Sequence, residues 1–279
     1  MLHLPPRDYL RHYLEVYWFA PPAALWRAIE ARALARLTFS PPLLDFGCGH
    51  GLFAAGLFGT AGEVTAGCDL LFHQLQTARR LGVYRSVQVA DGHRLPYTGA
   101  AFATVLSNSV LEHIPDPAPV VRELARLLRP GGRLILVVPS DRFPHLLEGV
   151  RRRRRRGDEA GAARYLARVN AHFRHHHYHP PEVWRQMLEG AGLRLEEVRY
   201  LVSPQAVATW DRANRLFGTD GGFSLFRLLA SPRLRPLGYQ RLLRRWLPAW
   251  LARRWRPLYE QDPAPEEGGG DLLLIARRP

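Results

Sequence analysis

The chain has 279 residues, 47% of them hydrophobic, and two cysteines, so it is long enough to bury one sizeable core and is not a disulfide-rich mini-protein. Its net charge is +14, and every basic residue is an arginine, which indicates a codon bias and weakens any argument from charge to nucleic acid. A positive field still attracts phosphates and anionic lipid headgroups. No run of about 18 uncharged apolar residues occurs, and Met1 to Leu14 lack the apolar stretch of a signal peptide, so we expect a cytoplasmic protein with Cys48 and Cys68 as buried free thiols.

The first 38 residues predict two helices. Aromatic residues recur at near-helical spacing in the first of them: Tyr9, Tyr13, Tyr17 and Trp18. Pro21-Pro22 breaks this run, and a second helix is expected over Ala23 to Leu37. The aromatic stripe either packs on the next domain or forms part of a lid.

From residue 43 short apolar runs alternate with segments of helical period. The predicted strands are Leu43–Phe46, Glu63–Cys68, Ser86–Ala90, Ala101–Leu106, Arg133–Val138, Leu193–Val202 and Asp271–Ala276. The predicted helices are Gly51–Thr60, Leu71–Leu81, Pro119–Leu128 and Pro181–Gly190. This alternation predicts an α/β fold with parallel strands and right-handed crossovers.

The pattern divides the chain into four parts. They are an N-terminal helical cap (1–40), an α/β core (41–202), a basic insertion (203–269) and a last core strand (270–279). The insertion is Arg-rich and irregular apart from an amphipathic helix, and Pro263 to Gly270 reads as a loose linker.

A glycine-rich turn carries the strongest chemical signal. Asp45-Phe46-Gly47-Cys48-Gly49-His50-Gly51 follows a predicted strand and opens a helix. Glycines at alternate positions let the backbone turn tightly and approach a ligand, and the helix N-terminus adds free N–H groups. The spacing is G-x-G-x-G, whereas the dinucleotide fingerprint is G-x-G-x-x-G.

Polar residues follow the next three strands at the same edge of the sheet. Asp69 ends the second strand, Asp91-Gly92 the third and Ser107-Asn108-Ser109 the fourth. Ligands of open α/β sheets bind outside the carboxyl ends of the strands, so these residues are expected to share one crevice with the glycine turn.

These stretches, in this order, resemble the class I S-adenosylmethionine-dependent methyltransferases, and within them the type 11 group of small-molecule enzymes. The matching segments lie between residues 43 and 138: Leu43–Gly51, Cys68-Asp69-Leu70, Ala90–Tyr97, Phe102–Val105, Leu111–Asp116 and Leu127–Leu134. The resemblance implies a Rossmann-like three-layer sandwich with strand order 3-2-1-4-5-7-6 and an antiparallel last strand, N-terminal helices, and a helical insertion before that strand. His50 departs from the family, which usually has a small residue there.

The resemblance also implies S-adenosylmethionine as the cofactor. It implies cofactor contacts at Gly47, Gly49, Asp69, Asp91 and Asn108, with Asp69 accepting hydrogen bonds from ribose hydroxyls. The complete set of residues that we expect around the cofactor is Asp45, Gly47, Cys48, Gly49, Gly51, Asp69, Leu70, Asp91, Gly92, Asn108 and Ser109.

Methyl transfer needs in-line positioning, and a general base only where the acceptor must lose a proton. His113, His177 and Tyr178 are the candidate catalytic residues. His113 lies just beyond the fourth strand, where a catalytic role and a purely structural one are equally supported. His177 and Tyr178 belong to a histidine-rich run over residues 172–179.

We predict no metal site in this run. Zinc ligands have typical spacings in sequence, and further groups hydrogen-bond to the ligating side chains. Adjacent histidines point in different directions, so few could bind one ion. No Cys-x-x-Cys accompanies them. A polar lip before the helix Pro181–Gly190 is the favoured interpretation, and a substrate-facing histidine or tyrosine comes second.

Two basic segments bear on partners. Arg151 to Arg156 is an unbroken run, which indicates a solvated face or a phosphate-binding loop. Residues 223–260 interleave nine arginines with large apolar residues: Phe223, Leu225, Phe226, Leu228, Leu229, Leu242, Leu243, Trp246, Leu247, Trp250, Leu251 and Trp255. Tyr239–Arg256 has an apolar stripe at helical spacing, with a break or kink at Pro248, which is typical of a helix lying in an anionic membrane surface or packing on the sheet or a second subunit.

The expected function is methyl transfer from S-adenosylmethionine to a small-molecule, lipid-linked or glycan-type acceptor, with the protein cytoplasmic or peripheral at the inner membrane face. An RNA methyltransferase is a rival, but Ser107-Asn108-Ser109-Val110 stands where base-methylating enzymes commonly have Asn/Asp-Pro-Pro-aromatic. A non-catalytic cofactor-binding scaffold is the second rival. An NAD-dependent dehydrogenase disagrees with the glycine spacing. Whether O, N or C is methylated, and the oligomeric state, stay open.

Overall fold

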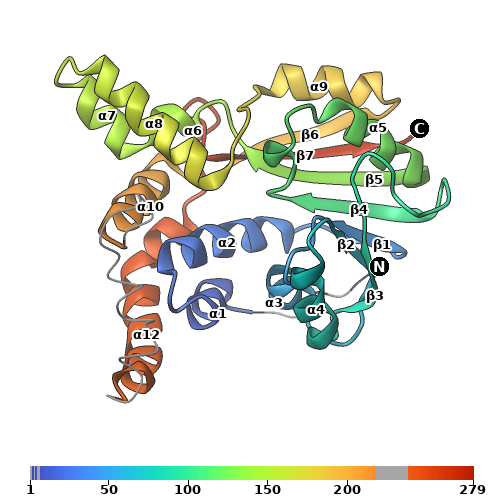
Figure 1. The fold of residues 1–279 in the computed structure, drawn as a ribbon, viewed down its shortest axis with the longest axis horizontal. Coiled ribbons are helices and arrows are strands. Elements are labelled where there is room, and N and C mark those ends of the chain that lie inside the picture. Colours follow the sequence, from blue (N-terminus) through green and yellow to red (C-terminus); the bar gives the residue numbers. More distant parts are fainter. Residues whose placement is uncertain (1, 3, 5–6, 218–237) are drawn as a thin grey trace.

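The computed structural model describes residues 2, 4, 7–217 and 238–279. Seven strands form one sheet in the order β3-β2-β1-β4-β5-β7-β6 (Figure 1). They are β1 (Leu43–Phe46), β2 (Val64–Asp69), β3 (Tyr84–Val89), β4 (Phe102–Asn108), β5 (Leu128–Pro139), β6 (Arg194–Leu201) and β7 (Asp271–Arg277). The first five strands pair in parallel, and β7 runs antiparallel to both β5 and β6. The predicted fold and strand order are confirmed.

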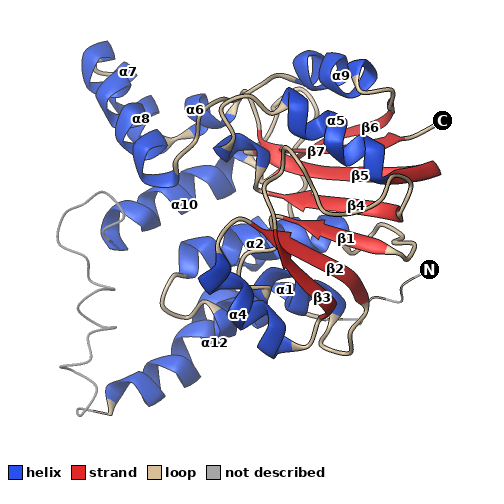
Figure 2. Ribbon diagram, turned by 45° about the vertical axis from the view of Figure 1, so that its right-hand side comes forward, coloured by secondary structure: helices blue, strands red, loops and turns tan. Residues whose placement is uncertain are grey.

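The sheet separates two apolar cores, because neighbouring side chains on a strand point to opposite faces. On β5, Ile135 and Val137 join the core under the N-terminal helices, while Leu134 and Leu136 join the core under α5 and α9. Figure 2 shows these helix layers on the two faces. The helices between β1 and β6 that flank the sheet are α3 (Leu52–Phe58), α4 (Phe72–Leu81), α5 (Ala118–Leu127) and α9 (Pro181–Gly190).

The N-terminal helices are α1 (Tyr9–Val16) and α2 (Pro21–Leu34). We expected Pro21-Pro22 to end the first helical run and a second helix to begin at Ala23. This was wrong by two residues, because α2 begins at Pro21. Both prolines lie in the first turn of α2, where the missing N–H would have no partner within the helix. The aromatic stripe packs inward: Tyr9, Tyr13 and Trp18 are buried.

The main differences from the sequence-based expectation lie in two helical regions. Between β5 and α9 the chain forms three helices that the sequence analysis did not predict: α6 (Phe143–Leu146), α7 (Glu148–Arg154) and α8 (Glu159–Phe173). After β6, where an irregular stretch was expected, α10 (Pro204–Phe217) precedes α12 (Tyr239–Glu260). A break or a kink was expected at Pro248; α12 continues through this residue, so the helix is not broken there.

The segment before β7 is not a loose linker at its end. Gly268, Gly269 and Gly270 are buried, and the Gly270 N–H donates to the Val202 carbonyl at 2.8 Å. Cys48 and Cys68 are buried free thiols, as expected. The apolar residues 223–229 of the basic segment lie outside the described residues. Within the described part of the chain, no helix is long and apolar enough to cross a membrane.

Candidate cofactor pocket and active site

A cavity of about 930 Å³ opens beyond the carboxyl ends of β1, β2, β3 and β4. Its lining includes all the residues expected to bind the cofactor: Asp45, Gly47, Cys48, Gly49, Gly51, Asp69, Leu70, Asp91, Gly92, Asn108 and Ser109. The parallel strands bring together residues up to 64 positions apart in sequence because their carboxyl ends meet at one sheet edge.

The turn after β1 needs glycine for two reasons. Gly47, Gly49 and Gly51 all have positive φ, at +73°, +52° and +73°. A Cβ on Gly47 would lie 2.3 Å from Cγ2 of Val110. The turn is therefore a bare backbone cradle, and it leads into α3 at Leu52.

Asp69 ties the glycine turn to β2. One carboxylate oxygen accepts from the Gly49 N–H at 2.9 Å, and the other accepts from the Leu71 N–H at 2.8 Å. Each oxygen keeps a further lone pair for a ligand hydroxyl. Just after the neighbouring strand β3, Asp91 accepts from the His93 N–H at 2.9 Å, which together with the His93 ring lowers the pKa of Asp91.

Asp45 lies beneath the cradle and is buried. Burial raises its pKa to about 6, and the charge of Asp69 adds to this, while the Tyr84 hydroxyl donates to Asp45 at 2.6 Å and opposes the shift. A cationic ligand group beside these two carboxylates would relieve their repulsion.

The N-terminal helices provide a pocket wall that sequence reasoning missed. Tyr17 and Arg27 line the cavity, and Arg27 donates to both carboxylate oxygens of Glu30, at 2.9 and 3.1 Å, and to the Ser109 hydroxyl at 2.8 Å. Ser109 in turn donates to Glu30 at 2.8 Å, and the Asn108 amide donates to it at 3.3 Å. Glu30 is fully buried, so α2 is fastened to the end of β4 by one buried carboxylate.

Glu30 was detectable in the sequence as the lone acid of a mostly apolar helix that also contains Arg27 and Arg32, but its partners were not. Burial alone would lower the pKa of Arg27, yet the charge of Glu30 outweighs this and raises it, so the guanidinium stays charged. Leu71 and Gln74 also line the cavity and were not assigned by the sequence analysis, whereas His172 and His176 belong to the histidine-rich run that it singled out.

Of the three candidate catalytic residues, the structure brings only His113 to the pocket. The His113 Nδ1 lies 3.2 Å from the Arg174 carbonyl, which suits an Nδ1–H donor and leaves Nε2 as an acceptor. Burial lowers the pKa of His113, so the ring is neutral near pH 7. A neutral imidazole at the cavity wall has the properties of a general base.

His177 and Tyr178 do not line the cavity. His177 Nε2 lies 3.1 Å from the Leu111 carbonyl and 3.0 Å from the Ile114 carbonyl. The Tyr178 hydroxyl donates to Asn170 at 2.7 Å. The His177 contacts fasten the segment before α9 to the turn after β4, and the Tyr178 contact fastens it to α8.

One group of side chains in the described part of the chain has the geometry to share a cation. The ligand atoms of Glu112, His113 and His175 lie within 4.8 Å of one another. His113 Nε2 and Glu112 Oε1 are 3.8 Å apart, and burial raises the pKa of Glu112 to about 8. The sequence analysis considered only histidines within residues 172–179, whereas this group joins that run to the turn after β4.

The chain matches the methyltransferase domain family over residues 10–198, which is more than half of its length. It belongs to this family. The resemblance to class I S-adenosylmethionine-dependent methyltransferases is thereby confirmed.

The chain matches less than two thirds of the length of each of two curated relatives. A ubiquinone biosynthesis O-methyltransferase from Xanthomonas oryzae pv. oryzae is 33% identical over 164 residues, covering 56% of this chain and 64% of that enzyme. The methyltransferase GfsG of Streptomyces halstedii is 38% identical over 100 residues, covering 34% of this chain and 36% of that protein.

Solved structures share the fold at low identity. A possible histamine N-methyltransferase from Thermotoga maritima superposes with a TM-score of 0.54 at 15% identity, covering 97% of this chain and all of that one. The geranyl diphosphate C-methyltransferase of Streptomyces coelicolor gives 0.56 at 14% identity, covering 93% and 84%. These likenesses support the methyltransferase fold.

The pocket fits the cofactor that the family implies. S-adenosylmethionine has a cationic amino-acid end, a ribose diol and an adenine ring. Acidic groups, a glycine cradle and apolar surface at Leu70 and Leu71 are all present in one cavity of suitable size.

Proposed function

We propose that this chain transfers a methyl group from S-adenosylmethionine to the hydroxyl of a small-molecule acceptor. The observation that carries the proposal is the single cavity lined both by the glycine cradle with Asp69 and Asp91 and by His113. Gly47, Gly49, Asp69, Asp91 and Asn108 would hold the cofactor. When bound, S-adenosylmethionine supplies an activated methyl group on a sulfonium.

The residues of this chain have two tasks in such a reaction. The first is positioning: walls from α2, the cradle and the turn after β4 orient the bound molecules, and proximity of this kind can contribute roughly 7–11 kcal/mol. The second is proton removal, because a hydroxyl acceptor must lose its proton. Neutral His113 would accept it at Nε2, which is worth about 10²–10⁴ in rate for a positioned base.

The choice of a hydroxyl acceptor rests on relatives and on the site together. The Xanthomonas relative is by name an O-methyltransferase of ubiquinone biosynthesis, which favours an amphiphilic or lipid-linked acceptor for this chain as well. A nucleic-acid acceptor is the weaker alternative because Ser107-Asn108-Ser109-Val110 lacks the proline-rich turn of base-methylating enzymes. A scaffold without catalysis remains the second alternative.

The test is product identification. Purified protein is incubated with methyl-labelled S-adenosylmethionine and with separated lipid, glycan and RNA fractions from cells, and the labelled product is identified. We expect label in an extractable small molecule or lipid, at a phenolic or alcoholic oxygen. An Asp69→Asn variant is the control for cofactor dependence. Label that appears only in RNA, and is lost on nuclease treatment, would replace the proposal with the nucleic-acid alternative.

We also propose that α12 contacts an anionic membrane surface. Trp246 and Trp250 are 57% and 48% exposed and stack with ring centroids 5.7 Å apart. Exposed arginines flank them at Arg244, Arg245 and Arg253. Exposed tryptophans beside basic residues are typical of helices that lie in the headgroup region.

Co-sedimentation with vesicles tests this contact. Vesicles with phosphatidylglycerol should bind the protein more tightly than pure phosphatidylcholine, and a Trp246→Ser/Trp250→Ser double variant should lose most of the binding. A Trp184→Phe variant, which changes a buried tryptophan of α9, should keep it. Binding that does not depend on anionic lipid would remove the membrane from the proposal.

A further inference from the structure

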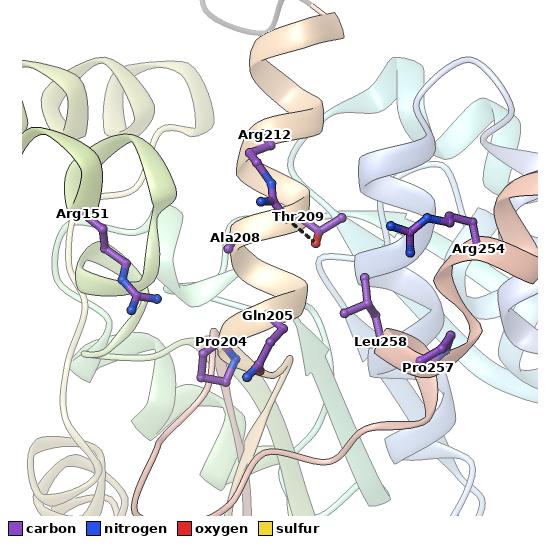
Figure 3. Close-up of a pocket in the computed structure, with 9 residues that line it drawn as sticks. All are labelled: Arg151, Pro204, Gln205, Ala208, Thr209, Arg212, Arg254, Pro257 and Leu258. Carbon is purple, nitrogen blue, oxygen red and sulfur yellow. Dashed lines mark hydrogen bonds between the residues drawn. The ribbon is translucent and has the colours of Figure 1, made fainter.

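A second cavity lies outside the cofactor pocket, where α7, α10 and α12 meet. Its volume is about 420 Å³, and its lining comes from all three helices: Arg151, Pro204, Gln205, Ala208, Thr209, Arg212, Arg254, Pro257 and Leu258. Figure 3 shows the guanidinium groups of Arg151, Arg212 and Arg254 around one hollow, each reaching it from a different helix. None of these residues lines the cofactor pocket.

The three arginines carry charge that the described part of the chain does not compensate. Among the described residues, no acidic side chain lines the cavity. Arg212 donates to the Thr209 hydroxyl at 3.3 Å, whereas Arg155 and Arg256, close in sequence to Arg151 and Arg254, pair with Glu148 and Asp8. Three like charges around one hollow raise the potential there and attract a multivalent anion.

The arginines stand on helices that are fixed to one another. Asp211, next to Arg212 on α10, is buried and accepts from the Gly149 N–H of α7 at 2.7 Å and from the Tyr165 hydroxyl of α8. On α12, Trp255 and Tyr259 are buried beside Arg254. The three arginines therefore stand on helices that are packed into the domain, which lowers the cost of ordering the site on binding.

Arginine suits one class of anion in particular. Its planar guanidinium offers paired N–H donors that match the oxygens of phosphate. A single carboxylate or phosphodiester would balance one of the three charges, while a phosphate monoester or a diphosphate balances about two or more. Gln205 and Thr209 add neutral polar groups on the same wall.

We propose that the cavity between α7, α10 and α12 is a binding site for a phosphate ester or diphosphate group, held by Arg151, Arg212 and Arg254. The helical spacing links it to the exposed tryptophans, because Trp246, Trp250 and Arg254 follow one another at intervals of four residues along one face of α12. The same group occurs in a lipid headgroup and in a soluble phosphate compound. The site is independent of the reaction at the cofactor pocket.

Calorimetry with the full chain and inorganic pyrophosphate tests the site itself. We expect one saturable site in the wild-type protein and at least a tenfold weaker affinity in each of Arg151→Gln, Arg212→Gln and Arg254→Gln. Arg80→Gln, an exposed arginine on α4, removes the same charge elsewhere and should leave the affinity unchanged within twofold. No saturable binding, or equal weakening in Arg80→Gln, would overturn the proposal in favour of the general positive field.

Vesicles distinguish the two sources of the phosphate group. If a headgroup occupies the cavity, pyrophosphate should displace the protein from vesicles that contain phosphatidic acid, whose headgroup is a phosphate monoester, and Arg212→Gln should weaken vesicle binding severalfold. If vesicle binding is absent or insensitive to pyrophosphate while calorimetry shows the site, the ligand is a soluble phosphate compound. Unchanged binding of S-adenosylhomocysteine by Arg212→Gln shows that the variant is folded and keeps this test separate from the proposed methyl transfer.

Discussion

Among single residues, Gly47 has little freedom to change. Its φ of +73° and the 2.3 Å approach of a Cβ to Val110 are two separate penalties. A left-handed conformation costs an alanine roughly 1–2 kcal/mol. Overpacking adds roughly 1–3 kcal/mol.

Gly47→Ala should therefore lower the free energy of unfolding by about 2–5 kcal/mol and abolish cofactor binding, as measured by urea denaturation and by calorimetry with S-adenosylhomocysteine. Gly131→Ala is the matched control: its φ is +75°, but nothing lies within 4 Å of the added carbon. That variant should lose only the conformational part. Equal losses in both would mean that contact with Val110 is unimportant.

Because Asp45 is buried, the free energy of unfolding should depend on pH, and the burial fixes the direction of this dependence. Its pKa rises to about 6 in the folded protein, so the folded state holds the proton more tightly than the unfolded state does. Its stabilising contribution is then complete below about pH 4 and is lost as the pH rises through 6. A shift of about two pKa units corresponds to about 3 kcal/mol.

The measurement compares the free energy of unfolding of the wild type with that of Asp45→Asn, which cannot ionise. The difference, wild type minus variant, should fall by up to about 3 kcal/mol between pH 4 and pH 7.5 in the absence of cofactor. Tyr84 can still donate to the amide oxygen, so the variant keeps that contact. A difference that does not change with pH would show that burial does not destabilise the ionised form of Asp45.

Substitution of His113 should slow methyl transfer without weakening cofactor binding. His113→Asn removes Nε2 as a proton acceptor and leaves the glycine cradle untouched. With a hydroxyl acceptor the turnover number should fall about 10²–10⁴-fold while the dissociation constant of S-adenosylhomocysteine stays within twofold. His172→Asn, which alters an exposed histidine of the same cavity, should cost much less. Full activity in His113→Asn would assign the proton to another group or to water.

Among the elements, the attachment of α2 to the end of β4 depends on Glu30. Removal of one partner of a buried charged pair typically costs about 3–5 kcal/mol, and the 31% exposure of the Arg27 side chain places this case at the low end. Glu30→Gln should therefore destabilise the protein by about 3 kcal/mol in urea denaturation. Glu15→Gln breaks the exposed pair with Arg11 and should cost less than about 0.5 kcal/mol. Similar costs for the two would show that Glu30 makes no special contribution.

The same attachment marks the limit of what the sequence predicts. The strands and the glycine turn follow from local patterns: apolar runs of strand length and glycines where φ must be positive. Arg27 and Ser109, by contrast, are 82 positions apart, and only the packing of α2 across the sheet brings them together. Sequence order therefore predicted one half of the cofactor pocket, the strand ends, and not the wall from α2.

Of two helices that the sequence analysis did not predict, α8 has local signals and α7 has none. In α8, Asp158 caps the helix and accepts from the Gly161 N–H at 2.7 Å, and the buried residues Ala162, Tyr165 and Val169 recur at helical spacing. In α7 only Gly149 and Val150 are buried, so no apolar period exists to be read in Glu148–Arg154. α7 is helical because α8 and α10 pack against it, which is tertiary information.

For the whole molecule, the cofactor pocket joins the N-terminal helices to the sheet, since Tyr17 and Arg27 face Gly47 and Asp69 across one cavity. A ligand that binds there only in the folded state stabilises the complete domain. At 100 times its dissociation constant, S-adenosylhomocysteine should add about 2.7 kcal/mol to the free energy of unfolding. For a domain near this size that corresponds to a rise in Tm of about 5–10 °C.

Differential scanning fluorimetry across a range of S-adenosylhomocysteine concentrations measures this rise. Asp69→Asn should shift the whole dose response to higher ligand concentration, because the neutral amide is a poorer acceptor for hydroxyls and its NH₂ group faces the Gly49 or Leu71 N–H. NAD is the matched ligand control: it brings a pyrophosphate to a turn whose G-x-G-x-G spacing differs from the dinucleotide fingerprint. A rise in Tm with NAD and none with S-adenosylhomocysteine would contradict the cofactor assignment while leaving the fold intact.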